Sequence, residues 1–294
     1  MSTPSSPTAV VTGANSGIGR ATAIHLAQNG YRVFGTVRKI EKASKAMAMA
    51  NEAGVSIEWV ELDIADDQSV TNGFAEIMQR TDHIDVLVNN AGVGGNAVIE
   101  ECPSSLYLEV MNVNLCGAVR CVQEVLPAMR QRKSGCIINI SSVVGRFAAL
   151  AQAPYVASKW ALEAMSEGLA QELAPFNIRV AIIEPGITKS AIFAKNIDAP
   201  NSTGAYDVHY RRMFQFYAAG MVNATDPFEV GAVIRYAIET TTPLLRYPVS
   251  WGGPEICAGR ESVSDAEWVA LGAVADDAQY MAGFEKLFGI SIAT

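Results

Sequence analysis

The stretch TAVVTGANSGIG, from Thr8 to Gly19, decides how this chain is expected to fold. A short apolar run typical of a strand leads through three glycines directly into an Ala- and Leu-rich pattern of helical spacing. In this context the glycines permit a tight turn and the close approach of a pyrophosphate, whose charge is stabilised at the helix N-terminus. Because a strand and a helix flank the glycines, the stretch predicts a dinucleotide-binding loop and not an ordinary Gly-rich turn.

Apolar runs of strand type recur along the chain and alternate with stretches of helical spacing. They lie near residues 31–37, 55–64, 84–89, 136–140, 177–184 and 244–248. This alternation predicts an α/β fold of Rossmann type, a doubly wound parallel sheet of about seven strands with helices on both faces. We expect residues 1–294 to form a single domain that binds its ligands beyond the carboxyl ends of the strands.

Composition excludes several classes of function. Half of the 294 residues are hydrophobic and 18% are charged, which allows a large buried core, and the net charge of -8 argues against nucleic-acid binding. We expect no secretory signal and no membrane span, because the N-terminal residues lack an apolar region and no apolar run is long enough. The five cysteines form no C-x-x-C pair and the three histidines show no metal-ligand spacing, so we expect a cytoplasmic protein without a metal site.

A second informative stretch runs from Gly135 to Lys159. A strand-like run there ends in two hydroxyl residues, and a helical pattern follows that begins with Tyr155 and Lys159 four residues apart. On a helix this spacing places the phenol and the ammonium on one face. A nearby positive charge favours the phenolate, so Lys159 is expected to bring the pKa of Tyr155 toward neutrality and make it a proton donor and acceptor. A surface aromatic beside a lysine would show the same spacing.

The two motifs together, Thr12-Gly13-x-x-x-Gly17-x-Gly19 and Tyr155-x-x-x-Lys159, resemble the short-chain dehydrogenase/reductase superfamily. The resemblance extends over about residues 8–250, with a weaker similarity to the branch of hydroxysteroid and retinol dehydrogenases. It implies an oxidoreductase that transfers hydride between a nicotinamide and a carbonyl or alcohol carbon. It also implies cofactor contacts along the glycine loop, from Gly13, Asn15, Ser16, Gly17, Ile18 and Gly19.

The same resemblance implies four catalytic residues, Ser142, Tyr155, Lys159 and Asn114. Family spacing selects Ser142 over Ser141 as the residue that donates a hydrogen bond to the substrate oxygen. Tyr155 would transfer the proton, and Lys159 would also bind the nicotinamide ribose. Asn114 would disturb its helix and hold a water molecule that connects Lys159 to solvent. Asn112 competes for this role, and a buried amide satisfied by the backbone is the structural alternative.

The end of the second strand bears on the choice of cofactor. Val37 stands where NAD-type members carry a carboxylate, and Arg38 follows it. Because an arginine at this position accommodates a 2′-phosphate, we expect NADP(H) in preference to NAD(H). Arg38 and Lys39 as solvated charges are the alternative, and Ser16 replaces the additional basic residue that many NADP-binding members carry in the loop.

Further cofactor contacts are implied by resemblance alone. Asp63 and Ile64 match the adenine contact, and the motif Asn-Asn-Ala-Gly matches the residues beside the adenosine ribose, with Asn89 less certain than Asn90, Ala91 and Gly92. The turn after the sixth strand would pack near the nicotinamide through Pro185, Gly186, Ile187 and Thr188. The side-chain contact there is open between Thr188 and Ser190.

The regular pattern stops between Ala191 and Thr225, where aromatic residues and methionines are dense. We expect residues 187–225 to form a substrate lid for a bulky hydrophobic carbonyl or alcohol, with core packing or a subunit contact as the alternative. Residues 250–294 form a C-terminal extension, in which residues 262–288 have amphipathic helical spacing suited to closing the pocket or a dimer. A homodimer or homotetramer is expected.

These observations predict an NADP(H)-dependent ketoreductase or alcohol dehydrogenase acting on a bulky ketone or aldehyde, of which a steroid or retinoid is one type. Two other classes stay open. One is a dinucleotide-binding regulatory protein without turnover, against which the complete catalytic set argues. The other is a sugar-nucleotide epimerase or dehydratase, which shares Tyr-x-x-x-Lys but has a different glycine spacing and a larger C-terminal domain.

Overall fold

A computed structural model describes residues 6–190 and 200–293. The described part of the chain contains a seven-stranded parallel sheet with the order β3-β2-β1-β4-β5-β6-β7. The strands are β1 (Thr8–Thr12), β2 (Arg32–Val37), β3 (Glu58–Glu61), β4 (Val86–Asn89), β5 (Gly135–Ile140), β6 (Ile178–Pro185) and β7 (Arg246–Val249). The predicted doubly wound α/β fold is confirmed. The strand order reverses between β1 and β4, and a crevice at this switch point is where such sheets bind ligands.

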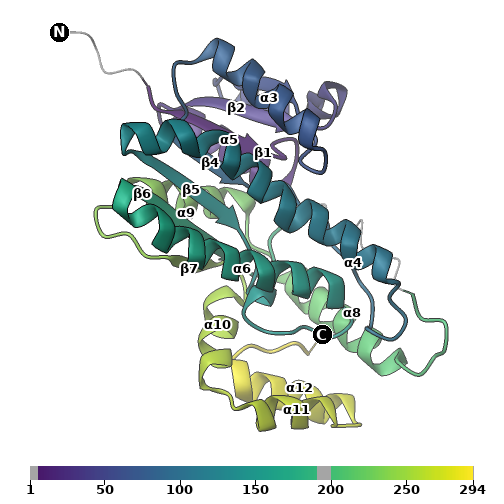
Figure 1. The fold of residues 1–294 in the computed structure, drawn as a ribbon. Helices are drawn as coiled ribbons and strands as arrows, with labels where there is room; N and C mark the ends of the chain where they lie inside the picture. The colour runs from purple at the N-terminus through teal and green to yellow at the C-terminus, as the bar shows by residue number, and fades with distance from the viewer. Residues whose placement is uncertain (1–5, 191–199, 294) are drawn as a thin grey trace.

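Alternate residues of the strands build two cores, one on each face of the sheet (Figure 1). Ala9 and Val11 of β1 pack in the core that includes residues of α1 (Gly17–Gln28) and α9 (Pro227–Glu239). Val10 faces the opposite core, to which α3 (Asp67–Arg80), α5 (Gly117–Arg132) and α6 (Ala153–Leu173) contribute. Burial on both faces explains why the strands read as continuous apolar runs. Shorter elements between these are η1 (Ile40–Ala43), α2 (Ser44–Glu52), η3 (Val143–Gly145) and η4 (Ala174–Phe176).

One long helical segment crosses the front of the sheet and is interrupted in its middle. The helix α4 (Ser104–Met111) continues through a π-helical turn, η2 (Asn112–Cys116), directly into α5. Such turns are rare and often occur at functional sites. The predicted disturbance of the helix at Asn114 is present in the structure.

The region predicted as a lid is more regular than its sequence indicated. Ile192 and Phe193 lie outside the described residues, but α8 (Asp207–Val222) is an unbroken helix, so the expected end of the regular pattern through Thr225 was wrong. Aromatic residues occur around much of this helix, and this hid its periodicity. Tyr210, Met213 and Phe216 are buried, whereas Phe214 is exposed.

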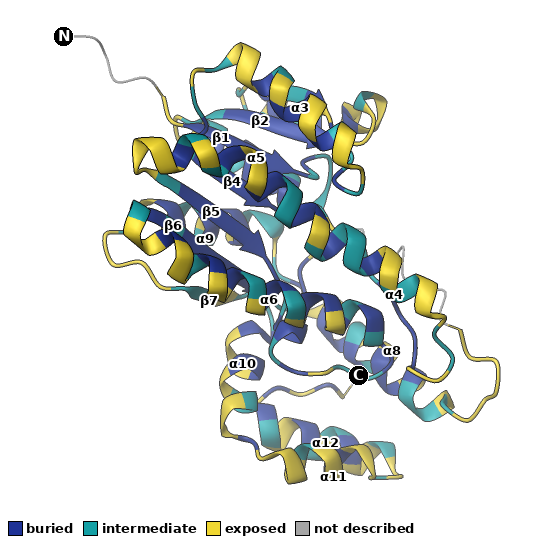
Figure 2. Cartoon of the chain, viewed as in Figure 1, coloured by how far each residue is buried: buried dark blue, intermediate teal, exposed yellow. Residues whose placement is uncertain are grey.

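The C-terminal extension consists of α10 (Gly253–Ser262), α11 (Asp265–Gly272) and α12 (Asp277–Phe288), which lie together below the carboxyl edge of the sheet (Figure 1). The amphipathic stretch thus forms two helices, because Ser264 and Asp276 each cap a new N-terminus. Figure 2 shows their buried sides turned inward. Phe147, two residues after η3, contacts Trp268 and Phe288 at ring-centre distances of 5.8 and 5.9 Å, which fixes the extension beside the loop after β5. No helix of the described ranges is long and apolar enough to cross a bilayer.

Candidate active site

A cavity of about 680 Å³ opens at the carboxyl ends of the strands. Most residues predicted from the sequence line it: Gly13, Asn15, Ser16, Gly17, Ile18, Arg38, Asp63, Ile64, Asn90, Ala91, Gly92, Ser142, Tyr155, Lys159, Pro185, Gly186, Ile187, Thr188 and Ser190. Gly19 and Asn114 do not line it. Both instead hold parts of the wall in place, as described below.

The glycine loop and the start of α1 form one end of the cavity. Gly13 and Gly17 have φ values of +66° and +53°, which L side chains rarely adopt. Gly19 lies under the loop, where a Cβ atom would contact the Asn90 side chain and lie 2.6 Å from the Gly13 carbonyl oxygen. The Asn90 side chain donates hydrogen bonds to the carbonyl oxygens of Thr12 at 2.8 Å and Gly13 at 3.3 Å. Asn90 and Gly19 therefore brace the loop from behind.

Replacing Gly19 by alanine is expected to displace this brace. The added methyl group has no space beside Asn90 and the Gly13 carbonyl, so the loop must shift away from its present path. We expect the affinity for a dinucleotide to fall by about tenfold or more, with a loss of stability of about 1–3 kcal/mol. Equilibrium binding and thermal unfolding measure the two effects. Gly168→Ala is the matched control, since nothing lies within 4 Å of the Cβ position there. Wild-type affinity in the Gly19 variant would contradict the bracing role.

The cavity wall at the end of β2 carries two cations. Val37 is buried, and Arg38 and Lys42 both line the cavity while remaining exposed to solvent. Lys42 was missed from the sequence because η1 folds it back toward the glycine loop, where Asn15 Nδ2 donates to its carbonyl oxygen at 3.5 Å. Lys39, Lys42 and Lys45 follow one another at short intervals, and no motif in the sequence distinguishes Lys42 from the other two. This end of the cavity suits an anionic group.

Asp63 lies on the same wall and is not needed as a helix cap. The side chain of Asp66 accepts a hydrogen bond from the Ser69 amide at 2.6 Å and caps α3. Asp63 Oδ1 accepts from the Ala65 amide at 3.0 Å. The Asp63 side chain is therefore held at the cavity wall by the Ala65 amide, while Asp66 provides the cap of α3.

Ser142, Tyr155 and Lys159 meet where β5, η3 and the first turn of α6 adjoin the cavity. Ser142 Oγ donates to the Pro185 carbonyl oxygen at 3.4 Å and accepts from the Val144 amide at 3.3 Å. Lys159 is buried, and its Nζ donates to the Ile140 carbonyl oxygen at 2.8 Å. These contacts fix the polar groups of Ser142 and Lys159 on the wall that Tyr155 also lines.

The pKa of Tyr155 differs from the expectation. Burial raises the pKa of Tyr155 to about 12, and a hydrogen-bonding contact with Ser142 only partly opposes this. Lys159 Nζ lies 5.6 Å from the centre of the Tyr155 ring and is directed to Ile140, so its charge is not at the phenol oxygen. Burial also lowers the pKa of Lys159 to about 8. The expected fall of the Tyr155 pKa toward neutrality was wrong for this arrangement, in which the phenol keeps its proton.

Asn114 connects two walls of the cavity without reaching it. Its Oδ1 accepts from the Val93 amide at 2.8 Å, and its Nδ2 donates to the Val93 carbonyl oxygen and to Ser158 Oγ, each at 2.9 Å. Ser158 Oγ in turn donates to the Tyr155 carbonyl oxygen at 2.7 Å. These contacts match the structural alternative for Asn114, in which a buried amide makes its hydrogen bonds to the backbone. Asn112 does line the cavity, and its side chain contacts Ala65 and Arg120.

The turn after β6 closes the cavity opposite α6. Thr188 is buried, and its hydroxyl pairs with Ser250 Oγ at 2.8 Å. Ser190 lies against the glycine loop, since a Cβ on Gly17 would be 3.1 Å from the Ser190 Cβ. Ser190 thus reaches the glycine loop while Thr188 is held by Ser250.

Comparison with known proteins identifies the family. The sequence profile of the short chain dehydrogenases matches residues 7–201. The chain belongs to the short-chain dehydrogenase family. It is 36% identical over 252 residues to the uncharacterized oxidoreductase YusZ of Bacillus subtilis, covering 83% of this chain and 89% of that protein. It is 34% identical to human retinol dehydrogenase 8 and 33% identical to human 17-beta-hydroxysteroid dehydrogenase type 1, each over 251 residues. These alignments cover 81% of this chain and 80% and 76% of those proteins.

Solved structures agree with this assignment. A short-chain dehydrogenase from Streptomyces avermitilis matches with a TM-score of 0.79 and 32% identity, over 94% of this chain and all of that one. An actinorhodin polyketide ketoreductase with NADPH matches at 0.70 and 31%, over 84% and 97%. An NAD+-bound xylitol dehydrogenase matches at 0.70 and 27%, over 84% and 99%. As a short-chain dehydrogenase, the chain is an oxidoreductase that binds a nicotinamide dinucleotide and acts on CH–OH or C=O groups, like its hydroxysteroid and retinol dehydrogenase relatives.

The other end of this dehydrogenase's cavity, beyond Tyr155, is lined by two aromatic residues of the predicted lid and by side chains that the sequence did not single out. Phe216 and Tyr217 of α8 lie there with Val144, Asn96 and Gln152. Tyr217 donates a hydrogen bond to Asn96 Oδ1 at 3.1 Å. No motif marks these residues, because they come from loops and a helix far apart in the chain. This end of the cavity therefore combines apolar surface with a few polar groups.

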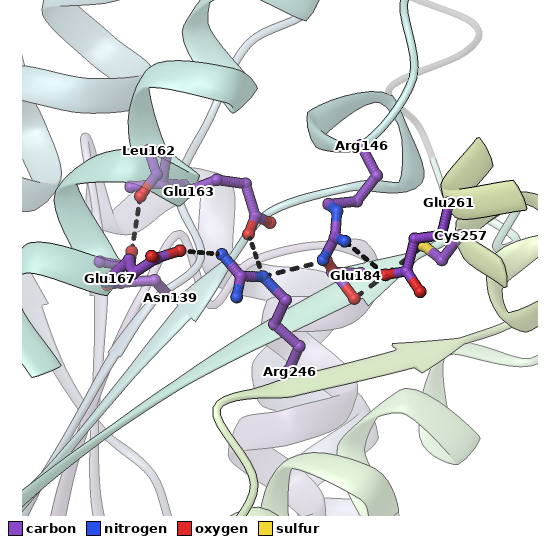
Figure 3. A network of polar contacts seen from close by, with 10 residues as sticks. Asn139, Arg146, Leu162, Glu163, Glu167, Glu184, Arg246, Cys257 and Glu261 are labelled. Carbon is purple, nitrogen blue, oxygen red and sulfur yellow. Dashed lines mark hydrogen bonds and ion pairs between the residues drawn. The ribbon is translucent and has the colours of Figure 1, made fainter. Parts of the chain in front are cut away.

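A cluster of charged side chains joins α6, β6, β7 and α10 (Figure 3). Glu184, the residue before Pro185, is 1% exposed, and its carboxylate lies 3.3 Å from Arg146 and 3.7 Å from Arg246. Burial, and then the negative charge of Glu163, raise the pKa of Glu184 to about 7, although both arginines oppose this. Glu184 therefore titrates close to neutral pH.

This raised pKa makes a prediction for stability. A carboxyl group whose pKa is higher in the folded than in the unfolded state destabilises the fold when it is charged. For Glu184, this destabilisation is complete above about pH 7 and absent below about pH 4.5. Glu184→Gln should therefore gain stability relative to the wild type as pH rises through this window, by up to about 3 kcal/mol. Chemical unfolding at pH values on either side of the window measures the difference. A difference that is independent of pH would show that Glu184 does not titrate there.

Proposed function

We propose that this short-chain dehydrogenase is an NADP(H)-dependent reductase of bulky hydrophobic ketones or aldehydes. The observation that carries the proposal is the placement of Ser142, Tyr155 and Lys159 on one cavity wall, with Arg38 and Lys42 at the far end. The cavity would then hold the reacting carbonyl of the substrate at one end and the 2′-phosphate of the cofactor at the other. The intact set of polar groups argues against a binding protein without turnover.

The cavity fits a nicotinamide dinucleotide. Gly13 and Gly17 keep the loop free of side chains, and α1 begins at Gly17, so its N-terminus faces the place for a pyrophosphate. The cavity wall at Asp63 and Ile64 would hold the adenine, and the wall at Asn90, Ala91 and Gly92 the adenosine ribose. Lys159, with the turn from Pro185 to Ser190, would hold the nicotinamide end. When bound, the nicotinamide supplies hydride to a carbonyl carbon or accepts it from an alcohol.

Arg38 and Lys42 favour NADP(H) over NAD(H). Val37 occupies the strand end with no carboxylate, and the two cations beside it suit a phosphate in charge and in hydrogen-bond donors. Among the similar structures, the ketoreductase contains NADPH and the xylitol dehydrogenase NAD+, so the preference rests on these residues of the chain itself.

The protonated Tyr155 favours reduction. With its pKa raised by burial, the Tyr155 hydroxyl carries its proton at neutral pH and can give it to a carbonyl oxygen that gains negative charge. Ser142 would donate a hydrogen bond to the same oxygen, and the buried ammonium of Lys159, 5.6 Å from the centre of the Tyr155 ring, would offset part of the charge left on Tyr155. Asn114, through Ser158, would keep the first turn of α6 in register with the strand wall.

The substrate end of the cavity supports the class of substrate. Phe216, Val144 and the ring of Tyr217 offer apolar surface, while Asn96 and Gln152 offer polar groups at its edge. We infer that residues 187–225 act as the lid over this end and that the chain forms a single domain with the extension 250–294. A cytoplasmic location and a homodimer or homotetramer belong to the same proposal.

The test is NADPH oxidation with a series of ketones and aldehydes of increasing bulk. We expect turnover that improves with hydrophobic bulk and that is slower with NADH. Oxidation of small polar carbonyls alone would contradict the substrate class. NADPH binding without turnover across the series would favour the binding-protein alternative.

A further inference from the structure

The charged cluster begins one helical turn from Lys159. Glu163 follows Lys159 by four residues on α6, so the two side chains lie on the same face. Glu163 is 5% exposed, which makes it one of two buried carboxylates in the cluster, with Glu184 of β6. Two buried carboxylates close together are costly unless cations compensate them. Their positions therefore need an explanation.

Arg246 of β7 holds the Glu163 carboxylate from below (Figure 3). Its Nε lies 3.0 Å from Glu163 Oε2, and its Nη2 lies 2.8 Å from Oε2 of the more exposed Glu167. The other oxygen of Glu163, Oε1, is buried and has no hydrogen-bond partner among the described residues. It packs beside Gly145, where a Cβ would be 3.3 Å away. Glu163 Oε2 is therefore held by Arg246, whereas no described group donates a hydrogen bond to Glu163 Oε1.

The remaining charged groups around Glu163 are accounted for by their own partners. Arg146, after η3, is shared between Glu184 at 3.3 Å and Glu261 of α10 at 2.6 Å. Cys257 of α10 contacts Glu184 Oε2 at 3.9 Å. Lys159 is the buried cation on the side of the cluster that faces the cavity, and the charge of Glu163 raises its pKa against the lowering effect of burial.

We propose that Glu163 is a positioning residue for Lys159: held by Arg246 one helical turn along α6, its carboxylate keeps charged the buried ammonium that donates to the Ile140 carbonyl oxygen. This inference rests on the proposed function, in which the charge of Lys159 stabilises Tyr155 after proton transfer. Through Glu184 and Arg146, the same cluster joins the catalytic wall to the C-terminal extension.

The experiment is an NMR titration of the Lys159 side chain in the protein without added cofactor, assigned by comparison with Lys159→Met. We expect Glu163→Gln to lower the pKa of Lys159 by about one unit. Glu167→Gln is the matched control, because it also removes a carboxylate from Arg246 but on the exposed side. A merely structural partner of Arg246 would leave the Lys159 pKa unchanged in both variants, and that result would overturn the proposal.

Two further measurements keep the test decisive. Glu163→Met replaces the carboxylate with an apolar side chain of similar length, so the same fall in the pKa of Lys159 is expected if Glu163→Gln folds poorly. Circular dichroism checks that each variant is folded. In the active enzyme, the alkaline limb of the pH–rate profile should move down by about one unit in Glu163→Gln and stay in place in Glu167→Gln. A shifted Lys159 titration in a protein without reductase activity would overturn the proposed function alone. An unshifted titration in an active enzyme would overturn only the role of Glu163.

Discussion

Replacing Tyr155 by phenylalanine is expected to lower kcat for carbonyl reduction by about 100- to 10,000-fold, because only the transferable proton is removed. The ring remains to fill the buried site over Lys159, so the affinity for NADPH should stay within about a factor of two. Steady-state kinetics and fluorescence titration of the cofactor measure the two quantities separately.

Tyr217→Phe is the control for this substitution. It removes a hydroxyl from the same cavity, one that donates to Asn96 instead of lying beside Ser142. The loss of one neutral hydrogen bond corresponds to about 1 kcal/mol, so we expect a change in rate of less than about tenfold. Equal losses in the two variants would mean that Tyr155 contributes packing and no proton.

Arg38→Asp is expected to reverse the choice of cofactor. The substitution removes a charge-assisted contact to a 2′-phosphate and places a carboxylate there, so NADPH binding should weaken by about 100-fold. NADH binding should be retained or improved, because a carboxylate at this strand end can accept hydrogen bonds from the ribose hydroxyls. Equilibrium titrations with both cofactors give the ratio.

Lys39→Asp is the control for Arg38→Asp, because it makes the same change in charge at the next residue, which does not line the cavity. It should leave the ratio of NADPH to NADH affinity nearly unchanged. If Arg38→Asp also leaves it unchanged, the 2′-phosphate is bound elsewhere, and Lys42 is then the residue to replace.

The sheet and the glycine loop could be predicted from the sequence because their signals are local. Residues 8–19 contain the strand, the turn and the helix start in one stretch, and Tyr155 and Lys159 need only a helix to share a face. Asn114 followed from the family resemblance, whose motifs are likewise short stretches of neighbouring residues. Each of these depends on neighbours along the chain.

The remaining features depend on contacts between distant segments. Lys42 reaches the cavity only because η1 turns back, and Asn96, Gln152 and Phe216 meet from three separate regions. The pKa of Tyr155 could not be obtained from spacing, because burial outweighs a lysine whose ammonium is directed at a backbone carbonyl. The contacts of Arg246 with both Glu163 and Glu184 require β6, β7 and α6 to be in place.

The central claim is that this chain moves hydride from NADPH to a carbonyl carbon while Tyr155 supplies the proton. The most direct measurement uses NADPH deuterated at nicotinamide C4 on each face in turn, with a bulky ketone, and mass spectrometry of the product alcohol. We expect one face to deliver a single deuterium to the carbinol carbon, at a rate that Tyr155→Phe reduces strongly. An alcohol formed without deuterium from either face, or no alcohol despite tight NADPH binding, would contradict the claim.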